Sequence, residues 1–309
     1  MTSGTVATIG TVARWFPRHG LARVAIARSA RGGDLRARMM GDASAVAEPF
    51  AMYEQIRRQG RLVQGRLMRT TVDHEICGQI LRSDAFGSPV NLARMPRPLR
   101  ALAGIFSDQL TLGPVDPPSM LVVDPPDHTR YRRLVSRVFT PRAVEALRRR
   151  IEEISDETLD DVAARGASGA VVDLVPTLAA PLPVTVIAEV LGIPVDRRDE
   201  LLRWAGGVAP ALDIGLRYRE FVNVERSTRA FNQFMHEHLE RLAQQPGDDI
   251  LSRLVALEAD GERLTHVEVM AVAGLLLGAG FETTVNLIGN GVVTLLRHPD
   301  QLRRLRDDP

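Results

Sequence analysis

The sequence has one cysteine, no lysine and few aromatic residues, which make up 5% of the chain. A single cysteine excludes an internal disulfide framework and fits a reducing compartment. All 39 basic residues are arginine, which indicates genome composition rather than a function. The start of the chain has no apolar core of the signal-peptide type. A net charge of +1 over 309 residues implies no strong attraction to nucleic acid or to an anionic membrane. We therefore expect a cytoplasmic protein.

The charge is concentrated at the N-terminus. Residues 1–42 contain seven arginines and two aspartates, and several of these arginines lie among Trp15, Phe16, Leu21 and Val24. This pattern predicts either a solvated basic arm or an amphipathic helix that touches a membrane surface. We expect residues 1–44 to form this arm and residues 45–309 to form one domain.

Hydrophobic periodicity predicts a mainly α protein with a few short strands. The predicted elements, in chain order, are a hairpin over 61–72 around Gly65, a helix that Asp73 caps and that ends near Arg82, a loop over 83–118, helices over 127–138 and from Thr140 to Gly166, a strand over 171–175, helices over 182–191, 197–205 and 217–244, a short helix capped by Asp248 or Asp249, and a long helix over 266–297.

The last helix begins at a capping box, Thr265 with Glu268, and would be roughly 48 Å long. Between Val269 and Leu296 its only charged residue is Glu282, so a transmembrane span is one interpretation. The polar residues near its centre and five glycines favour a buried core helix in a chain with no transmembrane segment.

The segment Ala279–Thr284, AGFETT, breaks the local rules of this helix three times. A glycine inside a helix costs roughly 1 kcal/mol against alanine. A buried carboxylate is unfavourable without a partner, and a threonine in mid-helix tends to bond back to a carbonyl one turn earlier. Such a concentration of unfavourable residues indicates a functional site.

Two histidine patterns suggest different roles. His128 and Arg132 are four residues apart, so on a helix they share one face and could hold a carboxylate or phosphate, although an exposed basic face explains them as well. His236, Glu237 and His238 are too close in sequence to face one another on a helix, so we expect a solvated surface and no metal site. The sequence has no HExxH, paired CxxC or GxSxG motif.

Three segments together resemble the cytochrome P450 monooxygenases, specifically the soluble bacterial, actinobacterial-like type. They are TTVDHEICGQILRSDAF, VVDPPDHTRYRRLVSRVFTPRAVEALR, and the stretch that runs from GDDILSRLVALEADG through AGFETT to Pro309. The family's oxygen-side helix carries Ala/Gly-Gly-x-Asp/Glu-Thr-Thr/Ser, which Ala279–Thr284 match throughout. Its haem-propionate helix carries His-x-x-x-Arg, which His128 and Arg132 match. The resemblance extends from about residue 45 to the end.

The resemblance implies a cytochrome P450 fold and assigns roles to the AGFETT segment. Ala279 and Gly280 would leave room over the face of a haem. Thr283 would donate a hydrogen bond to dioxygen, and Glu282 would deliver protons toward it. Phe281 would line the substrate pocket.

The resemblance also implies a cofactor, a reaction and partners. His128 and Arg132 would hold the carboxylates of haem b. The reaction would insert one oxygen atom of O2 into a hydrophobic organic substrate, with electrons from a ferredoxin-type partner and no role for nucleic acid.

One part of the family's pattern is missing from the chain. The cysteine loop that ligates haem iron, and the Glu-x-x-Arg helix before it, would follow the oxygen-side helix, but the chain stops at Pro309. Cys77 matches an early helix, so we assign it no metal-binding role. We expect an inactive fragment truncated before the Glu-x-x-Arg helix, with an exposed apolar face. The alternative is a haem-free hydrophobic-ligand carrier or scaffold protein that reuses the fold.

Overall fold

The computed structural model describes residues 10–42, 45, 48–66, 68–88, 112–259 and 262–308. The chain divides into two compact units, one formed by residues 1–107 with 210–223 and the other by 108–209 with 224–309. The predicted domain of residues 45–309 contributes to both units and stays a prediction. Most of the predicted loop over 83–118 lies outside the described residues.

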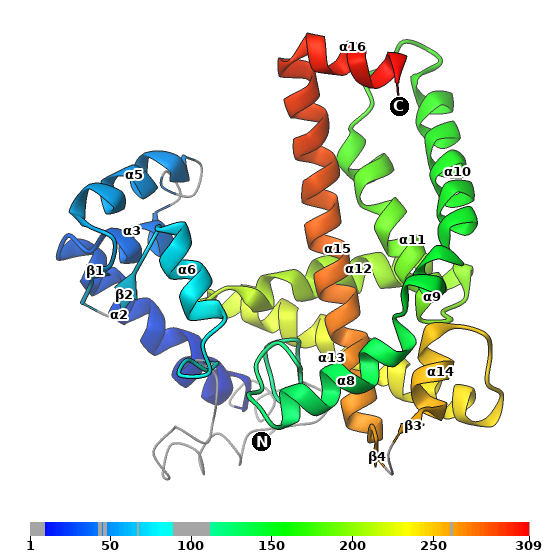
Figure 1. Ribbon diagram of the computed structural model, residues 1–309, viewed down its shortest axis with the longest axis horizontal. Helices are drawn as coiled ribbons and strands as arrows, with labels where there is room; N and C mark the ends of the chain where they lie inside the picture. Colours follow the sequence, from blue (N-terminus) through cyan, green and yellow to red (C-terminus); the bar gives the residue numbers. More distant parts are fainter. Residues whose placement is uncertain are drawn as a thin grey trace, which may run out of the picture. The chain divides into compact units, whose positions relative to one another are not determined.

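The first unit contains short helices and one hairpin. Residues 10–15 are helical and continue into η1 (Phe16–Gly20), α2 (Leu21–Arg31), α3 (Leu35–Gly41), α5 (Pro49–Gln59), β1 (Val63–Gln64), β2 (Arg69–Thr70) and α6 (His74–Leu81) (Figure 1). Its small core is centred on Ala45, Met52 and Ile56, against which side chains of α3 and of the hairpin pack.

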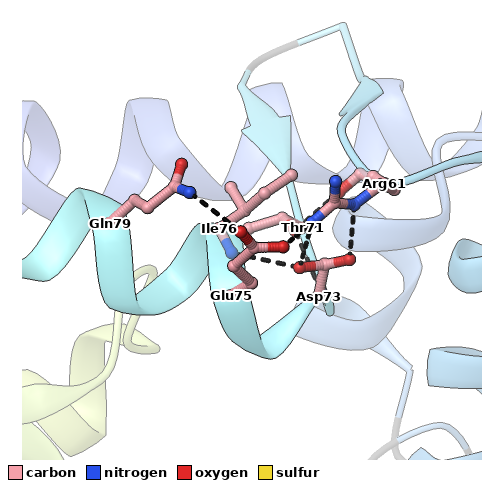
Figure 2. A network of polar contacts seen from close by, with 6 residues as sticks. All are labelled: Arg61, Thr71, Asp73, Glu75, Ile76 and Gln79. Atoms are coloured by element: carbon pink, nitrogen blue, oxygen red, sulfur yellow. Dashed lines mark hydrogen bonds and ion pairs between the residues drawn. The ribbon is translucent and has the colours of Figure 1, made fainter.

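The hairpin and the helix after it confirm the predictions for this region. Strands β1 and β2 pair antiparallel, and Asp73 caps α6 by accepting the Ile76 amide at 3.0 Å. Figure 2 shows how Arg61, just before the hairpin, donates to both oxygens of Asp73 and to Glu75. These bonds hold the pKa of Asp73 at about 2. The fork of Arg61 therefore connects the two ends of the hairpin region.

Asp34 connects α3 to the same hairpin. Its side chain caps α3 by accepting the Ala37 amide at 3.0 Å, and its second oxygen accepts the Arg66 amide at 2.7 Å. One carboxylate thus bonds the start of its own helix and the backbone of Arg66, 32 residues after Asp34.

The N-terminal arm is helical and packs on residues 210–223 of its own unit. The Trp15 indole donates to the Leu216 carbonyl at 2.9 Å, and Arg23 donates to the Gly215 carbonyl at 2.8 Å. The imidazole of His19 accepts the Leu216 amide through Nδ1 at 3.2 Å. One side of the arm is therefore fixed by specific hydrogen bonds.

The second unit is built from helices around α15. In chain order its elements are α8 (Asp127–Val138), α9 (Pro141–Glu145), α10 (Arg148–Gly166), η4 (Val175–Ala179), α11 (Pro181–Val190), η5 (Val195–Arg197), α12 (Arg198–Val208), α14 (Ile250–Ala256), β3 (Glu258–Ala259), β4 (Glu262–Arg263), α15 (His266–Arg297) and α16 (Pro299–Asp307). Two elements, η6 (Ala209–Leu212) and α13 (Tyr218–Gln244), have residues in both units. The core buries Leu134, Leu191, Met235, Leu251 and Leu277.

Two predictions in this unit are wrong. The helix predicted from Thr140 to Gly166 is broken after Glu145, so that α9 and α10 are separate. The strand predicted over 171–175 is absent from the described residues. Val171 is fully exposed, and the Asp173 side chain accepts the Val175 amide at 3.0 Å, which starts a helical turn instead.

Helix α15 has the predicted bounds and the predicted capping box. The Glu268 amide donates to the Thr265 hydroxyl, and the Thr265 amide donates to the Glu268 carboxylate at 2.7 Å. By length and composition alone this helix could cross a membrane. Its N-terminal half, however, is buried at Val272 and Leu277 and contacts α11, α12 and α14. We therefore interpret α15 as a core helix.

Candidate functional site

The segment Ala279–Thr284 lies in the middle of α15 and presents two different sides. Phe281 is buried in the core, 7% exposed. Gly280 faces α11, where a Cβ atom would lie 3.1 Å from Cδ1 of Ile187. Ala279 and Thr283 are exposed on the opposite side. The missing side chain of Gly280 therefore serves the packing of α11 on α15, whereas the small residue on the open side is Ala279.

Both threonines bond back to carbonyls one turn earlier, as predicted. The Thr283 hydroxyl donates to the Ala279 carbonyl at 2.6 Å, and the Thr284 hydroxyl donates to the Gly280 carbonyl at 2.8 Å. In this rotamer the hydroxyl proton of Thr283 is occupied, while its oxygen faces solvent. Thr283 can donate to another acceptor only after its hydroxyl turns away from Ala279.

Glu282 lies at the edge of the exposed side and is partly buried. It accepts a hydrogen bond from the Asn286 amide at 3.3 Å, one turn further along α15. Among the described residues no other hydrogen bond reaches this carboxylate, which leaves acceptor positions for water.

His128 and Arg132 lie one turn apart on α8, as predicted. His128 is partly buried, Arg132 is exposed, and neither side chain forms a hydrogen bond or ion pair with any residue that the structure describes. The neighbouring arginines differ, because Arg130 pairs with Glu268 and Arg133 pairs with Glu262. Within the described part of α8, His128 and Arg132 are thus available for an external anion.

A polar contact at Glu268 fixes α8 to the beginning of α15. The Glu268 carboxylate bonds Arg130 and the buried hydroxyl of Tyr131 in addition to its capping role. Partial burial alone would raise the pKa of Glu268, but hydrogen bonds from Thr265 and Tyr131 outweigh it and lower the pKa. Sequence reasoning missed this contact. The sequence feature that could have indicated it is Glu268, the glutamate of the capping box.

The two predicted groups belong to one unit but do not touch. Fifteen residues separate Glu268, next to α8, from Thr283, which corresponds to about 22 Å along the helix axis. No hydrogen bond among the described residues joins His128 or Arg132 to the AGFETT segment.

The exposed side of α15 beyond Thr283 carries apolar side chains among the polar Asn286, Asn290 and Thr294. Ala279, Thr283 and Leu287 are spaced four apart, and Leu287 is 72% exposed. Val293 and Leu296 are also exposed further along. A planar apolar group with two carboxylates, such as haem, fits this chemistry, because its ring could lie on the small residues and its carboxylates could bond the side chains of His128 and Arg132 on α8.

Side chains that could ligate a metal do not gather into a site in the part of the chain that the structure describes. No cluster of three or more His, Cys, Asp or Glu residues suited to a metal ion occurs in the described ranges. The one cysteine of the chain, Cys77, is a free thiol on α6 of the first unit.

The prediction that His236 and His238 are both solvated is wrong for His238. This imidazole is buried and lies 2.7 Å from the Leu191 carbonyl through Nε2. Burial lowers its pKa. His236 is exposed and lies 2.7 Å from Nε2 of His266. The burial of His238 could have been predicted from its spacing, because it follows Met235 by three residues and so lies on the same buried face of α13.

Comparison with known proteins identifies the family. The family model for cytochrome P450 matches residues 210–308. The chain is 41% identical over 299 residues to "Putative cytochrome P450 140" of Mycobacterium tuberculosis, covering 96% of this chain and 67% of that protein. It is 42% identical over 268 residues to "Cytochrome P450 monooxygenase PikC" of Streptomyces venezuelae, covering 85% of this chain and 59% of that protein.

A solved structure agrees with these sequence matches. The myxobacterial cytochrome P450 CYP267B1 in complex with myristic acid has a TM-score of 0.71 and 35% identity, covering 88% of this chain and 66% of that one. The chain thus spans about two thirds of the length of these relatives, or less. The identities and the mainly helical fold lead to one conclusion: this chain belongs to the cytochrome P450 family.

Proposed function

We propose that the complete protein is a haem-dependent monooxygenase, which inserts one oxygen atom of O2 into a hydrophobic organic substrate. The observation that carries this proposal is the combination, within one unit, of an exposed strip of small residues on α15, Ala279 and Thr283, with the side chains of His128 and Arg132 on α8, which have no partner among the described residues. Family membership supports it, since PikC is a monooxygenase by name.

The strip on α15 would support one face of the haem. Ala279 keeps that face clear because a larger side chain would project from the exposed side of the helix. Gly280 lets α15 approach Ile187 closely and so fixes the height of the strip above α11. Phe281, which is buried on the core side of α15, would support this strip from behind rather than line the side on which the haem would lie.

Thr283 and Glu282 would transfer protons from solvent toward the haem face. Haem, when bound, supplies the iron that activates O2. Thr283 would rotate away from the Ala279 carbonyl and hold a proton at Oγ1 toward the haem face. Glu282, which has open acceptor positions, would return protons to Thr283 from solvent.

His128 and Arg132 would bind the haem carboxylates. Both are free of described partners, and an arginine can bond a carboxylate with two parallel N–H groups. The ion pair of Arg130 with Glu268 fixes the helix that carries them. This division of roles explains why Arg132 has no described partner while Arg130 and Arg133 on the same helix are paired.

We also propose that the 309-residue chain does not itself form the haem–thiolate centre. The one thiol, Cys77, lies on a helix of the other unit and not in a loop after α15. Electrons would come from a ferredoxin-type protein, and we expect a cytoplasmic site of action. An apolar acid such as the myristic acid bound by CYP267B1 illustrates the substrate class.

Haem titration of the purified chain tests the binding roles. We expect Arg132→Gln to weaken haem binding about tenfold, the effect of losing one charge-assisted hydrogen bond. Arg149→Gln, on the exposed face of α10, is the matched control. Ala279→Leu should also block binding, whereas Ala164→Leu on α10 should not. Equal haem affinity in all four variants would refute the proposed site.

The spectrum of the reduced, carbon-monoxide-bound chain tests the role of Cys77. We expect no red-shifted, thiolate-type Soret band. If such a band is present and is lost in Cys77→Ser, Cys77 ligates the iron and our account of the ligand is wrong. With the complete protein, ferredoxin and its reductase, isotope-labelled O2 should place one labelled oxygen atom in the product.

A further inference from the structure

The exposed side of the N-terminal arm carries a row of apolar side chains. Val12, Phe16, Leu21 and Val24 are between 42 and 54% exposed. Single exposed apolar residues are ordinary on protein surfaces, but a contiguous row indicates an interaction site. The opposite side of the same helix is buried at Ile26, so the row is not a consequence of a loosely attached segment.

The π-helical turn η1 aligns this row. The Leu21 amide donates to the Phe16 carbonyl, five residues earlier, so these two side chains lie one wide turn apart on the same side. Val12 is one α-turn before Phe16, and Val24 is one α-turn after Leu21. An uninterrupted α-helix would move Leu21 away from Phe16 by one position. The four side chains therefore form one line.

Arginines continue the same line at its C-terminal end. Arg28 and Arg31 follow Val24 by four and seven residues and are exposed. Neither forms an ion pair with a described residue, and the same holds for Arg23 at the side of the line. The helix end attracts cations, which accounts for the arginines but not for the apolar row before them.

We propose that residues 10–31 form a peripheral binding surface for an anionic lipid bilayer. The apolar half of the line would enter the boundary between headgroups and acyl chains, and the guanidinium groups would remain at the lipid phosphates. Nucleic acid would use the arginines but gains nothing from Phe16 and Val24. The contacts of Trp15 and His19 with Leu216 would hold the first unit against the bilayer. This inference does not depend on the haem chemistry.

The test is co-sedimentation of the 309-residue chain with vesicles of phosphatidylcholine containing a third of phosphatidylglycerol. We expect binding that falls as salt is added and that is absent with pure phosphatidylcholine. Arg28→Gln with Arg31→Gln should lower the partition coefficient about 25-fold, at roughly fivefold for each arginine. Phe16→Ser with Val24→Ser should lower it at least tenfold.

Matched controls carry the same changes elsewhere. Leu81→Ser alters an 86% exposed side chain of α6, and Arg303→Gln with Arg306→Gln removes two exposed cations from α16. Both controls should bind vesicles like the unaltered chain. The proposal is overturned if the unaltered chain stays in solution with the anionic vesicles. It is equally overturned if Phe16→Ser with Val24→Ser binds them unchanged, which would leave only a non-specific cationic patch or a site for an acidic protein. The salt titration uses only the unaltered chain, so its result does not depend on whether a variant folds.

Discussion

Two glycines of α15 permit a direct measurement of how tightly this helix packs on α11. Around Gly289 no atom lies within 4 Å of an added Cβ, so Gly289→Ala meets no obstacle. At Gly280 the same methyl group would lie 3.1 Å from Cδ1 and 3.4 Å from Cγ1 of Ile187. The two substitutions are chemically identical and differ only in this contact.

The magnitudes follow from this difference. Alanine is favoured over glycine in a helix interior by about 1 kcal/mol, so Gly289→Ala should raise the free energy of unfolding by that amount. At Gly280 the same gain is opposed by overpacking, which typically costs about 1–3 kcal/mol. We therefore expect Gly280→Ala to be neutral or destabilising by up to about 2 kcal/mol. Ile187→Val removes Cδ1, and in that background Gly280→Ala should become stabilising.

Urea denaturation of the four chains, followed by circular dichroism, completes a double-mutant cycle. The coupling energy between positions 187 and 280 should be about 1 kcal/mol or more. If Gly280→Ala stabilises the chain as much as Gly289→Ala does, and the cycle shows no coupling, α15 does not press on Ile187 and our account of Gly280 is wrong.

Three further predictions concern caps, protons and the contact of α8. Thr265→Ala should lower the free energy of unfolding by about 1 kcal/mol, measured in urea, because the Glu268 amide loses its acceptor. Burial, assisted by the charge of a neighbouring arginine, lowers the pKa of His19 to about 4 from its ordinary 6.5. As the pH falls, the unfolded chain takes up this proton first, so stability should decrease between pH 6.5 and 4. His19→Asn, which keeps an acceptor but does not titrate, should flatten the pH profile, and an unchanged profile would exclude His19 as its source. Arg130→Ala should cost about 2 kcal/mol because Glu268 is left partly buried without its cation, whereas Arg149→Ala should change the stability by less than about 0.5 kcal/mol.

The elements that sequence reasoning located best are those with local chemical signals. The capping box at Thr265 and the cap at Asp73 each fixed the beginning of a helix to the residue. These signals work because the side chain and the amide that it caps are three residues apart, so no distant contact is needed.

The errors occurred where distant contacts or a competing local bond decided the structure. The apolar run around Val171 has strand composition, but no neighbouring strand pairs with it in the described part of the chain, and Asp173 bonds the backbone first. His238 was assigned to the surface because His236 and His238 are too close in sequence to face one another on a helix. Its burial depends on the Leu191 carbonyl, 47 residues earlier.

The candidate site could be predicted as a motif but not as a geometry. Local rules identified the AGFETT segment and the back-bonding of its threonines. They could not say that Gly280 and Phe281 face the core while Ala279 and Thr283 face outward, because that depends on where α11 packs. The pairing of Arg130 rather than Arg132 with Glu268 also required the structure.

The carboxylate of Asp34 has a consequence for the dynamics of the first unit. It accepts the Ala37 amide of α3 through one oxygen and the Arg66 amide of the hairpin through the other. Rotation of this single side chain releases both amides at once, so the start of the helix and the tip of the hairpin lose protection together. Hydrogen exchange at these two positions, far apart in sequence, would then report one shared opening event rather than two independent frayed ends.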